Sequence, residues 1–190
     1  MEIKEQKKQI RKSIREIKKS TPKEEMDSLS IAIQHKVLEL EEINKASTIL
    51  LYYSLPDEVS TEILLEKLSN RRGGTKKIIL PVVEGDYLIL KEYIPEEVLS
   101  GYQKILEPSG KECIDPREIE FAVIPGMAFD KSCNRMGRGK GFYDRLIPHL
   151  NCVKCGLGYN YQIVEEIPCE EFDKPLDIVI TESCIYRNKL

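Results

Sequence analysis

Short apolar runs rich in β-branched and aromatic residues recur along this chain, and they constrain its fold more than any other feature. Five such runs lie at 47–53, 77–83, 119–124, 153–158 and 178–185. Runs of this length and composition are typical of buried strands. A sixth run, at 87–94, alternates in polarity and predicts a strand at an edge of the sheet.

The first 45 residues predict helices rather than strands. Residues 3–20 have an amphipathic pattern whose apolar face carries Ile10, Ile14 and Ile17. The sequence Thr21-Pro22-Lys23-Glu24 then has the form of a capping box, with proline at the first helical position. We expect the second helix to run from Pro22 to about Glu42, with inward-facing Leu29, Ile33, Val37 and Leu40.

Helical segments also separate the later strands. Ser60 or Thr61 can cap a helix that ends near Arg72, before Gly73-Gly74, and another helix should run from about residue 140 to Leu150. Residues 95–118 are punctuated by proline and glycine and predict mostly loop, with room for a helical turn at 95–100. This alternation predicts the α/β class: a single three-layer domain over residues 1–190, with a mostly parallel sheet flanked by helices and preceded by two N-terminal helices.

Composition restricts the setting of this domain. Hydrophobic residues make up 41% and charged residues 32% of the chain, and its net charge of −3 gives no overall attraction to nucleic acid or anionic membranes. No apolar run approaches the ~20 residues that span a bilayer. The basic first 20 residues lack the apolar core of a secretory signal. We therefore expect a cytoplasmic monomer that binds neither nucleic acid nor membrane.

The six cysteines do not form the disulfide framework of a small secreted domain, so we expect reduced thiols. His149, Cys152 and Cys155, with Cys169 further on, admit a zinc site as an alternative. Residues three apart on a strand point to opposite faces, so Cys152 and Cys155 cannot easily share a metal. Ordinary buried cysteines are therefore the favoured interpretation.

The segment 134–144, NRMGRGKGFYD, interleaves three glycines with cations between a predicted strand and a predicted helix. Its glycines permit positive φ and a close approach of the backbone to a ligand. Its cations, together with the helix N-terminus, suit phosphate oxygens. The spacing fits neither the Walker A nor the dinucleotide-binding motif. The segment therefore indicates a polyphosphate ligand, with a flexible basic loop as the alternative, and Asp144 could cap the helix or hold Mg²⁺.

The N-terminal helix offers a second group of cations. Residues 1–19 carry eight basic and three acidic side chains, and Lys7 and Arg11 lie four apart on one helical face, away from the isoleucines. On charge alone, a solvated helix face is the favoured interpretation. A phosphate-binding role requires this helix to reach the glycine-rich segment, which the sequence does not decide.

Pro125-Gly126-Met127-Ala128-Phe129-Asp130, followed by the 134–144 segment, closely resembles the signature of the 5-formyltetrahydrofolate cyclo-ligase (5,10-methenyltetrahydrofolate synthetase) family. Weaker matches occur in the family's order along nearly the whole chain. They are the Lys7–Arg11 helix, Tyr52–Val59 with Thr61, Leu80-Pro81-Val82, Glu107-Pro108 and the segment from Pro168 to Thr181. One departure is Phe142, which stands where the family commonly has tyrosine.

The resemblance implies an enzyme that converts 5-formyltetrahydrofolate to 5,10-methenyltetrahydrofolate, with ATP as co-substrate and Mg²⁺ as cofactor, and releases ADP and phosphate. It implies that Arg138, Lys140 and Tyr143 are catalytic. It implies that ATP is bound by Lys7, Arg11, Arg135, Met136, Gly137, Arg138, Gly139, Lys140, Gly141, Phe142 and Tyr143. Tyr53, Glu58 and Tyr143 would contact the folate, and Asp144 and Asp173 would serve the metal.

Two other classes of function stay open at this point. One is a folate- or nucleotide-binding protein without turnover, although the loop cations and both candidate metal carboxylates are present. The other is an enzyme similar to sugar-phosphate isomerases on a related sheet, which would need neither ATP nor Mg²⁺. Turnover of 5-formyltetrahydrofolate that depends on ATP distinguishes the cyclo-ligase from both.

Overall fold

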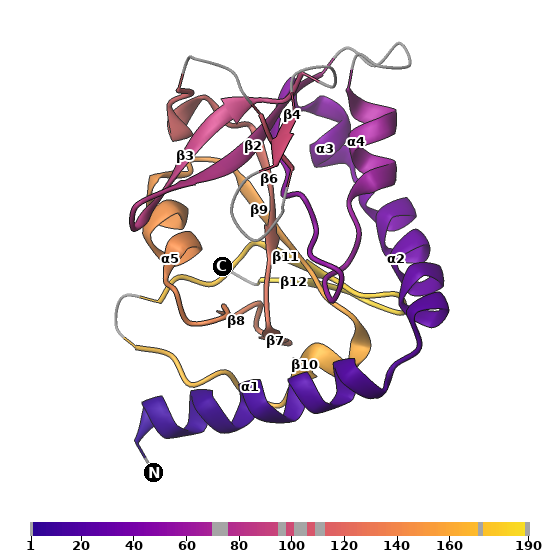
Figure 1. Ribbon diagram of the computed structural model, residues 1–190, viewed down its shortest axis with the longest axis vertical. Helices are drawn as coiled ribbons and strands as arrows, with labels where there is room; N and C mark the ends of the chain where they lie inside the picture. The colour runs from indigo at the N-terminus through magenta and orange to yellow at the C-terminus, as the bar shows by residue number, and fades with distance from the viewer. Residues whose placement is uncertain are drawn as a thin grey trace.

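A computed structural model describes residues 2–69, 76–94, 98–100, 106–108, 113–170 and 173–188. Its centre is a seven-stranded sheet with the order β12-β11-β9-β6-β1-β2-β3 (Figure 1). The strands are β1 (Thr48–Leu50), β2 (Lys77–Glu84), β3 (Tyr87–Glu92), β6 (Phe121–Pro125), β9 (Val153–Leu157), β11 (Ile178–Ile180) and β12 (Ile185–Arg187). The five inner strands are parallel, and β3 and β12 pair antiparallel at the two edges. The predicted mostly parallel sheet and the edge position of residues 87–94 are confirmed.

Helices cover both faces of this sheet, as Figure 1 shows. They are α2 (Lys23–Leu38), α3 (Glu41–Lys45), α4 (Glu62–Leu68) and α5 (Phe142–Leu146), whereas α1 (Ile3–Ser20) packs against a separate small sheet. Alternate strand residues supply two apolar cores: Ile49 packs with α2, α3 and α4, whereas its neighbour Leu50 packs with Leu146 of α5. This alternation follows from the period of two along a strand and produces the three predicted layers.

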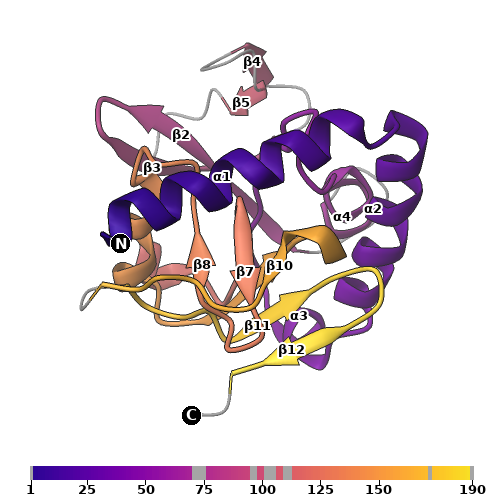
Figure 2. The ribbon, with the colours of Figure 1, turned by 90° about the horizontal axis from the view of Figure 1, so that it is seen from below.

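A small third core seats α1. Ile14 packs there against Met127, Ala128, Met136 and Ile167, which belong to or border a small sheet of β7 (Ala128–Asp130), β8 (Arg135–Met136) and β10 (Ile163–Val164). Figure 2 shows α1 lying across these three short strands. Ile17, predicted to face inward, is 37% exposed, so the buried stripe of α1 is centred nearer to Ile14. None of the helices in the described ranges is both long and apolar enough to cross a membrane.

The predicted loop after β6 contains a hairpin that the sequence pattern did not indicate. Its strands β7 and β8 are only three and two residues long, too short for a visible period. The turn between them is fixed by the buried carboxylate of Asp130, which accepts hydrogen bonds from the backbone N–H groups of Ser132 and Asn134 and from the Asn134 side chain. This Asx-type turn leads directly into the glycine-rich segment.

Several predicted helix ends were wrong. Thr21 does not cap α2: its hydroxyl donates to the carbonyl of Ile17, and Pro22 occupies the N-cap position. The second helix stops at Leu38, and residues 41–45 form the separate helix α3. The last predicted helix ends at Leu146 and continues as a 3-10 turn over Ile147–His149, because Pro148 has no N–H to donate to the preceding turn.

Two expectations about strands and loops also changed. The run 178–185 does not form one strand, because the chain turns after Ile180 and returns as β12. Residues 98–100 form strand β4 (Val98–Ser100), paired with β5 (Leu106–Pro108), where a helical turn was expected. The remainder of that expected turn lies outside the described residues. The helix expected to end near Arg72 is α4, which ends at Leu68, because Ser69 already has an extended backbone.

Candidate functional site

A cavity of about 320 Å³ opens at the carboxyl ends of the central parallel strands. From β1 the chain passes to β2 on one side, and β6 pairs on the other side, so β1 is the switch point of the sheet. Ligands of open α/β sheets bind at such crevices. The lining residues are Tyr52, Tyr53, Leu55, Glu58, Pro81, Val83, Leu88, Pro125, Gly126, Arg135, Gly137, Arg138, Lys140, Gly141, Phe142, Tyr143 and Asp144.

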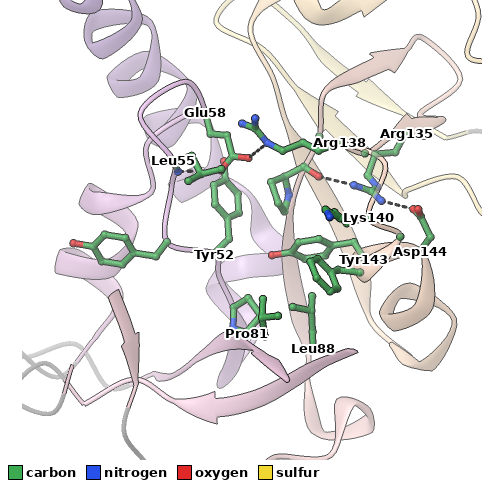
Figure 3. A pocket seen from close by; sticks show the side chains of 17 residues that line it. Tyr52, Leu55, Glu58, Pro81, Leu88, Arg135, Arg138, Lys140, Tyr143 and Asp144 are labelled. Carbon is green, nitrogen blue, oxygen red and sulfur yellow. Dashed lines mark hydrogen bonds and ion pairs between the residues drawn. The ribbon is translucent and has the colours of Figure 1, made fainter. Parts of the chain in front are cut away.

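The cavity has an apolar end and a charged end, as Figure 3 shows. Pro81 and Leu88, from strands β2 and β3, form part of the apolar wall. Glu58 and Arg138 meet at the opposite end, and the ring of Tyr143 lies between the two ends (Figure 3). Burial raises the pKa of Tyr143, and the charge of Glu58 adds to this, so its hydroxyl stays neutral across physiological pH.

The glycine-rich segment turns through left-handed backbone at two of its three glycines. Gly139 has φ +104° and Gly141 has φ +72°, whereas Gly137 does not have a positive φ. A Cβ atom at Gly141 would lie 2.8 Å from the guanidinium of Arg145, which packs across the segment. Arg145 donates to the carbonyl of Lys140 at 3.0 Å and also to that of Asp86, so it ties the segment to the β2–β3 turn.

The N-terminal helix reaches this segment. Arg11 donates through Nε to the carbonyl of Gly137 at 2.9 Å, and its guanidinium also lies beside Gly139. Lys7 and Arg11 lie on the same inner side of α1 as the buried Ile14, so the expectation that they point away from the isoleucines was wrong for Ile14. Arg11 therefore lies beside the cavity through its bond to Gly137, although neither Lys7 nor Arg11 is among the residues that line the cavity.

Lys7 is paired with the acidic segment near the C-terminus. Its ammonium lies 2.9 Å from Asp173 and 3.3 Å from the more exposed Glu170. Burial opposes the charge on Lys7, but the hydrogen bonds to these two carboxylates outweigh it and raise the pKa of Lys7. For Asp173, burial alone would raise the pKa, but the Glu170 N–H and the Lys7 ammonium hold it below its ordinary value.

Arg135 is the most buried cation of the glycine-rich segment, with a side chain only 4% exposed. It donates through Nη1 to the carbonyl of Pro125 at 2.8 Å and through Nη2 to Asp144. Its guanidinium also lies over the ring of Tyr143, 5.6 Å from the centroid. Met136, by contrast, points its side chain into the core beneath α1, its carbonyl accepts from the N–H of Met127, and it is not among the residues that line the cavity.

Arg138 bridges two consecutive carboxylates. Its Nε donates to Glu58 at 3.0 Å and its Nη2 donates to Asp57 at 2.6 Å. Burial would lower the pKa of Arg138, but its bonds to Asp57 and Glu58 outweigh this and raise it. The other carboxylate oxygen of Glu58 accepts from the N–H of Leu55 at 3.0 Å. Lys140 lines the cavity, and its ammonium has no ion-pair partner in the described part of the chain.

Four side chains fix the loop that carries Glu58. Lys18 donates to the carbonyl of Asp57 at 2.6 Å, Tyr159 to that of Glu58 at 3.1 Å, and Tyr52 to that of Val59 at 2.7 Å. The hydroxyl of Ser30 accepts from the N–H of Ser60 at 3.1 Å. The loop is therefore held at four successive backbone groups, which fixes the position of the Glu58 carboxylate.

Sequence reasoning missed Lys18, Asp57 and Tyr159. One signal for Lys18 was available, because residues 7, 11, 14 and 18 fall on one stripe of a helix. That stripe is the face that α1 presents to the rest of the chain. Asp57 and Tyr159 carried no such pattern, since their contacts are with residues far away along the chain.

Asp144 and Asp173, the two candidate metal ligands, line a small second cleft beside the cavity, together with Asn134 and Cys169. Each carboxylate is paired with a cation, Arg135 or Lys7. The described residues contain no group of three or more side chains of the types that ligate metals. One or two carboxylates fit Mg²⁺ that is bound mainly by phosphate oxygens and water, so this donor set suits a metal that arrives with a nucleotide.

The alternative zinc residues do not converge. Cys155 packs in the core under α2, α3 and α4, whereas Cys152 packs against the core on the other face of the sheet. Cys152 and Cys155 therefore face opposite sides, as the strand geometry predicted. All six cysteines are free thiols, and burial raises the pKa of Cys152 to about 11. Three of them (Cys113, Cys169 and Cys184) are exposed, although buried positions were expected.

Comparison with known proteins gives consistent matches over nearly the whole chain. A sequence model of the 5-formyltetrahydrofolate cyclo-ligase family matches residues 3–182. A 5-formyltetrahydrofolate cyclo-ligase of Haemophilus influenzae is 32% identical over 182 residues, covering 90% of this chain and 96% of the relative. A probable 5-formyltetrahydrofolate cyclo-ligase of Schizosaccharomyces pombe is 31% identical, covering 86% and 88%.

Solved structures of similar proteins agree. The NMR structure of the 5,10-methenyltetrahydrofolate synthetase of Aquifex aeolicus superposes with a TM-score of 0.86 at 31% identity, covering 96% of this chain and 93% of that one. A 5,10-methenyltetrahydrofolate synthetase from Mycoplasma pneumoniae superposes with a TM-score of 0.74 at 25% identity, covering 93% and 98%.

Proposed function

The chain belongs to the 5-formyltetrahydrofolate cyclo-ligase family, and we propose that it converts 5-formyltetrahydrofolate to 5,10-methenyltetrahydrofolate in a reaction driven by ATP and dependent on Mg²⁺. The hydrogen bond between Arg11 and Gly137 carries this proposal, because it joins two segments 126 positions apart. It brings Arg11 of α1 next to Gly137, which lines the cavity together with Arg138, Lys140, Glu58 and Tyr143. A triphosphate and a flat, polar substrate would then lie side by side.

The chemistry needs positioning more than a protein nucleophile. In the proposed reaction the formyl oxygen attacks the γ-phosphorus of ATP, an O–P bond forms, and ADP leaves. The neighbouring folate nitrogen then attacks the activated formyl carbon and loses its proton, and phosphate departs with the original oxygen. Phosphoryl transfer of this kind is accelerated by in-line positioning and by cations on the equatorial oxygens. Arg138 and Lys140 are suited to that role, and Arg11 and Arg135 to holding the rest of the triphosphate.

The residues proposed to bind the folate line the same cavity. Glu58 keeps free lone pairs that can accept from pterin N–H donors, although one oxygen already binds Arg138 and the other binds Leu55. A carboxylate at this place also discriminates against analogues without those donors. Tyr53 and Tyr143, with Pro81 and Leu88, offer aromatic and apolar surface to the rings of the substrate. Tyr143, between the two ends of the cavity, would touch both substrates.

Asp144 and Asp173 would bind Mg²⁺ together with the phosphate oxygens of the nucleotide. Bound there, the ion would neutralise charge that develops on the transferring phosphoryl group. In the structure, Asp144 is paired with Arg135 and Asp173 with Lys7. When the two carboxylates bind Mg²⁺, both cations can bind phosphate oxygens instead. As part of the same proposal, the protein works as a monomer in the cytoplasm, with 5-formyltetrahydrofolate and ATP as its partners and without contact to nucleic acid or membrane.

The direct test is to mix the protein with 5-formyltetrahydrofolate, Mg²⁺ and ATP and to follow the absorbance of the methenyl product. We expect product only when ATP and Mg²⁺ are both present, with one ADP released for each molecule formed. Product without ATP would instead support chemistry of the isomerase type. Binding of both ligands without any product would support a protein that has kept the site but not the turnover.

A further inference from the structure

The guanidinium of Arg138 is held along one edge and free along the other. Nε and Nη2 are the donors to Glu58 and Asp57, while Nη1 has no hydrogen-bond partner among the described residues. A guanidinium has five N–H donors in a rigid plane, so three remain after these two bonds. Arg138 can therefore grip phosphate oxygens without leaving its two carboxylates.

A buried lysine stands behind this arrangement. The side chain of Lys18 is 3% exposed, and its ammonium donates to the backbone carbonyl of Asp57 at 2.6 Å and lies 3.4 Å from the carboxylate oxygen Oδ2. Arg138 uses the other oxygen, Oδ1. Asp57 thus has one cation on each oxygen, and the position of its carboxylate is fixed from both sides.

The charges of this cluster also indicate that Lys18 fixes Asp57. Asp57, Glu58, Lys18 and Arg138 together carry two negative and two positive charges. Burial alone would raise the pKa of Asp57, but Arg138 and Lys18 outweigh it and keep the pKa below its ordinary value. Burial lowers the pKa of Lys18, and the nearby Asp57 opposes this. Without Lys18 the cluster would have a net negative charge beside the place proposed for a triphosphate, and the Asp57 carboxylate would be held on one oxygen only, by Arg138.

From this chain of contacts we propose that Lys18 and Asp57 are positioning residues of the reaction: Lys18 fixes Asp57, and Asp57 with Glu58 orients Arg138 so that its free edge faces the transferring phosphoryl group. The proposal rests on the function proposed above, since it assigns Arg138 to that group. Neither Lys18 nor Asp57 needs to touch a substrate. Their effect on the rate passes through Arg138.

The test is a double-mutant cycle with ATP and 5-formyltetrahydrofolate as substrates. Lys18→Met and Asp57→Asn should each lower kcat about ten- to a hundredfold, because a shift of about 1 Å in a catalytic group can cost a factor of this size. In an Arg138→Ala background the same two changes should alter kcat by less than about twofold, since their target is absent. Lys18→Arg should recover part of the loss by restoring the cation, and Lys19→Met, one position along on the exposed side of α1, should behave as wild type.

The outcomes separate the two proposals. No turnover by the wild-type protein would reject the proposed function and this inference with it. Turnover by wild type, with losses that multiply fully in the Arg138→Ala background, would reject the inference alone and assign Lys18 a structural role. Tighter ATP binding by Asp57→Asn would also overturn it, because Asp57 would then compete with the nucleotide for Arg138. If Lys18→Met does not fold, Asp57→Asn decides, since Asp57 is partly exposed and its amide analogue leaves no cavity.

Discussion

Replacing Arg11 by alanine should weaken the binding of ATP about thirtyfold and leave the binding of the folate nearly unchanged. Arg11 donates through Nε to the carbonyl of Gly137, and its two terminal nitrogens have no hydrogen-bond partner among the described residues, so both remain for phosphate oxygens. A hydrogen bond to a charged group contributes about 1.5–3 kcal/mol. A loss of ~2 kcal/mol, at 1.36 kcal/mol for each factor of ten, corresponds to about thirtyfold in a dissociation constant.

Calorimetric titration with Mg²⁺ and a non-hydrolysable ATP analogue measures this loss without interference from the chemical step. Arg15→Ala is the matched control, because Arg15 is an exposed arginine one turn further along α1. It removes the same charge from the helix but not from the cavity, and we expect a change below about twofold. Equal effects of Arg11→Ala and Arg15→Ala would refute a specific contact and leave only the long-range charge of the helix. An Arg11→Ala effect as large on folate as on ATP would refute the assignment to the nucleotide.

The other predictions address the remaining parts of the site. Glu58→Gln should raise the KM for 5-formyltetrahydrofolate about tenfold or more and change the KM for ATP far less, because a neutral amide accepts weaker hydrogen bonds from N–H donors than a carboxylate does. Steady-state kinetics with each substrate varied in turn measure both values, and equal changes in both would count against contact with the pterin. Asp173→Asn should raise the Mg²⁺ concentration for half-maximal rate several-fold, whereas Glu170→Gln, which removes the other carboxylate near Lys7, should not; a magnesium titration of both variants decides. Tyr159→Phe should lower the free energy of unfolding by about 1–2 kcal/mol in urea titrations, since it deletes a buried hydroxyl bound to Ser30 and Glu58. Burial raises the pKa of Tyr159 to about 12, so its contribution is complete below the ordinary tyrosine pKa near 10 and is lost as pH rises from about 10 to 12; the wild type should therefore lose more stability over that interval than Tyr159→Phe.

Patterns that extend over several residues were predictive for the fold. The apolar runs at 77–83 and 87–94 appear as the paired strands β2 and β3, and residues 3–20 form α1 as expected. These elements bury a periodic set of side chains, so the period is visible in the sequence. Strands β7 and β8 are too short to have a period and depend on the Asp130 turn, which is a contact between a side chain and nearby backbone. The start of α2 differed for a related reason, because Thr21 bonds backward to Ile17 and not forward into α2.

For the site, the sequence indicated residue types and the structure adds their partners. The glycine-rich segment was recognisable because its glycines and cations are adjacent, and it lies at the cavity as expected. The pairings of Arg138 with Asp57, and of Lys7 with Asp173, join residues 81 and 166 positions apart. No local pattern encodes such pairs. Lys7, Arg135 and Arg138 are thus already paired with carboxylates, a property that residue counts along short windows miss.

The seating of α1 links these observations. Ile14 is the buried apolar residue of the helix. Arg11 lies three positions before it and Lys18 four positions after it. At 1.5 Å per residue, the stripe from Lys7 to Lys18 extends about 16 Å. One apolar contact therefore fixes three cations at once: Lys7 opposite Asp173, Arg11 at Gly137, and Lys18 behind Asp57. A shift of the α1 register by one residue would turn this stripe by about 100° and break all three contacts together. These three contacts therefore favour the observed register of a helix that is rich in charge.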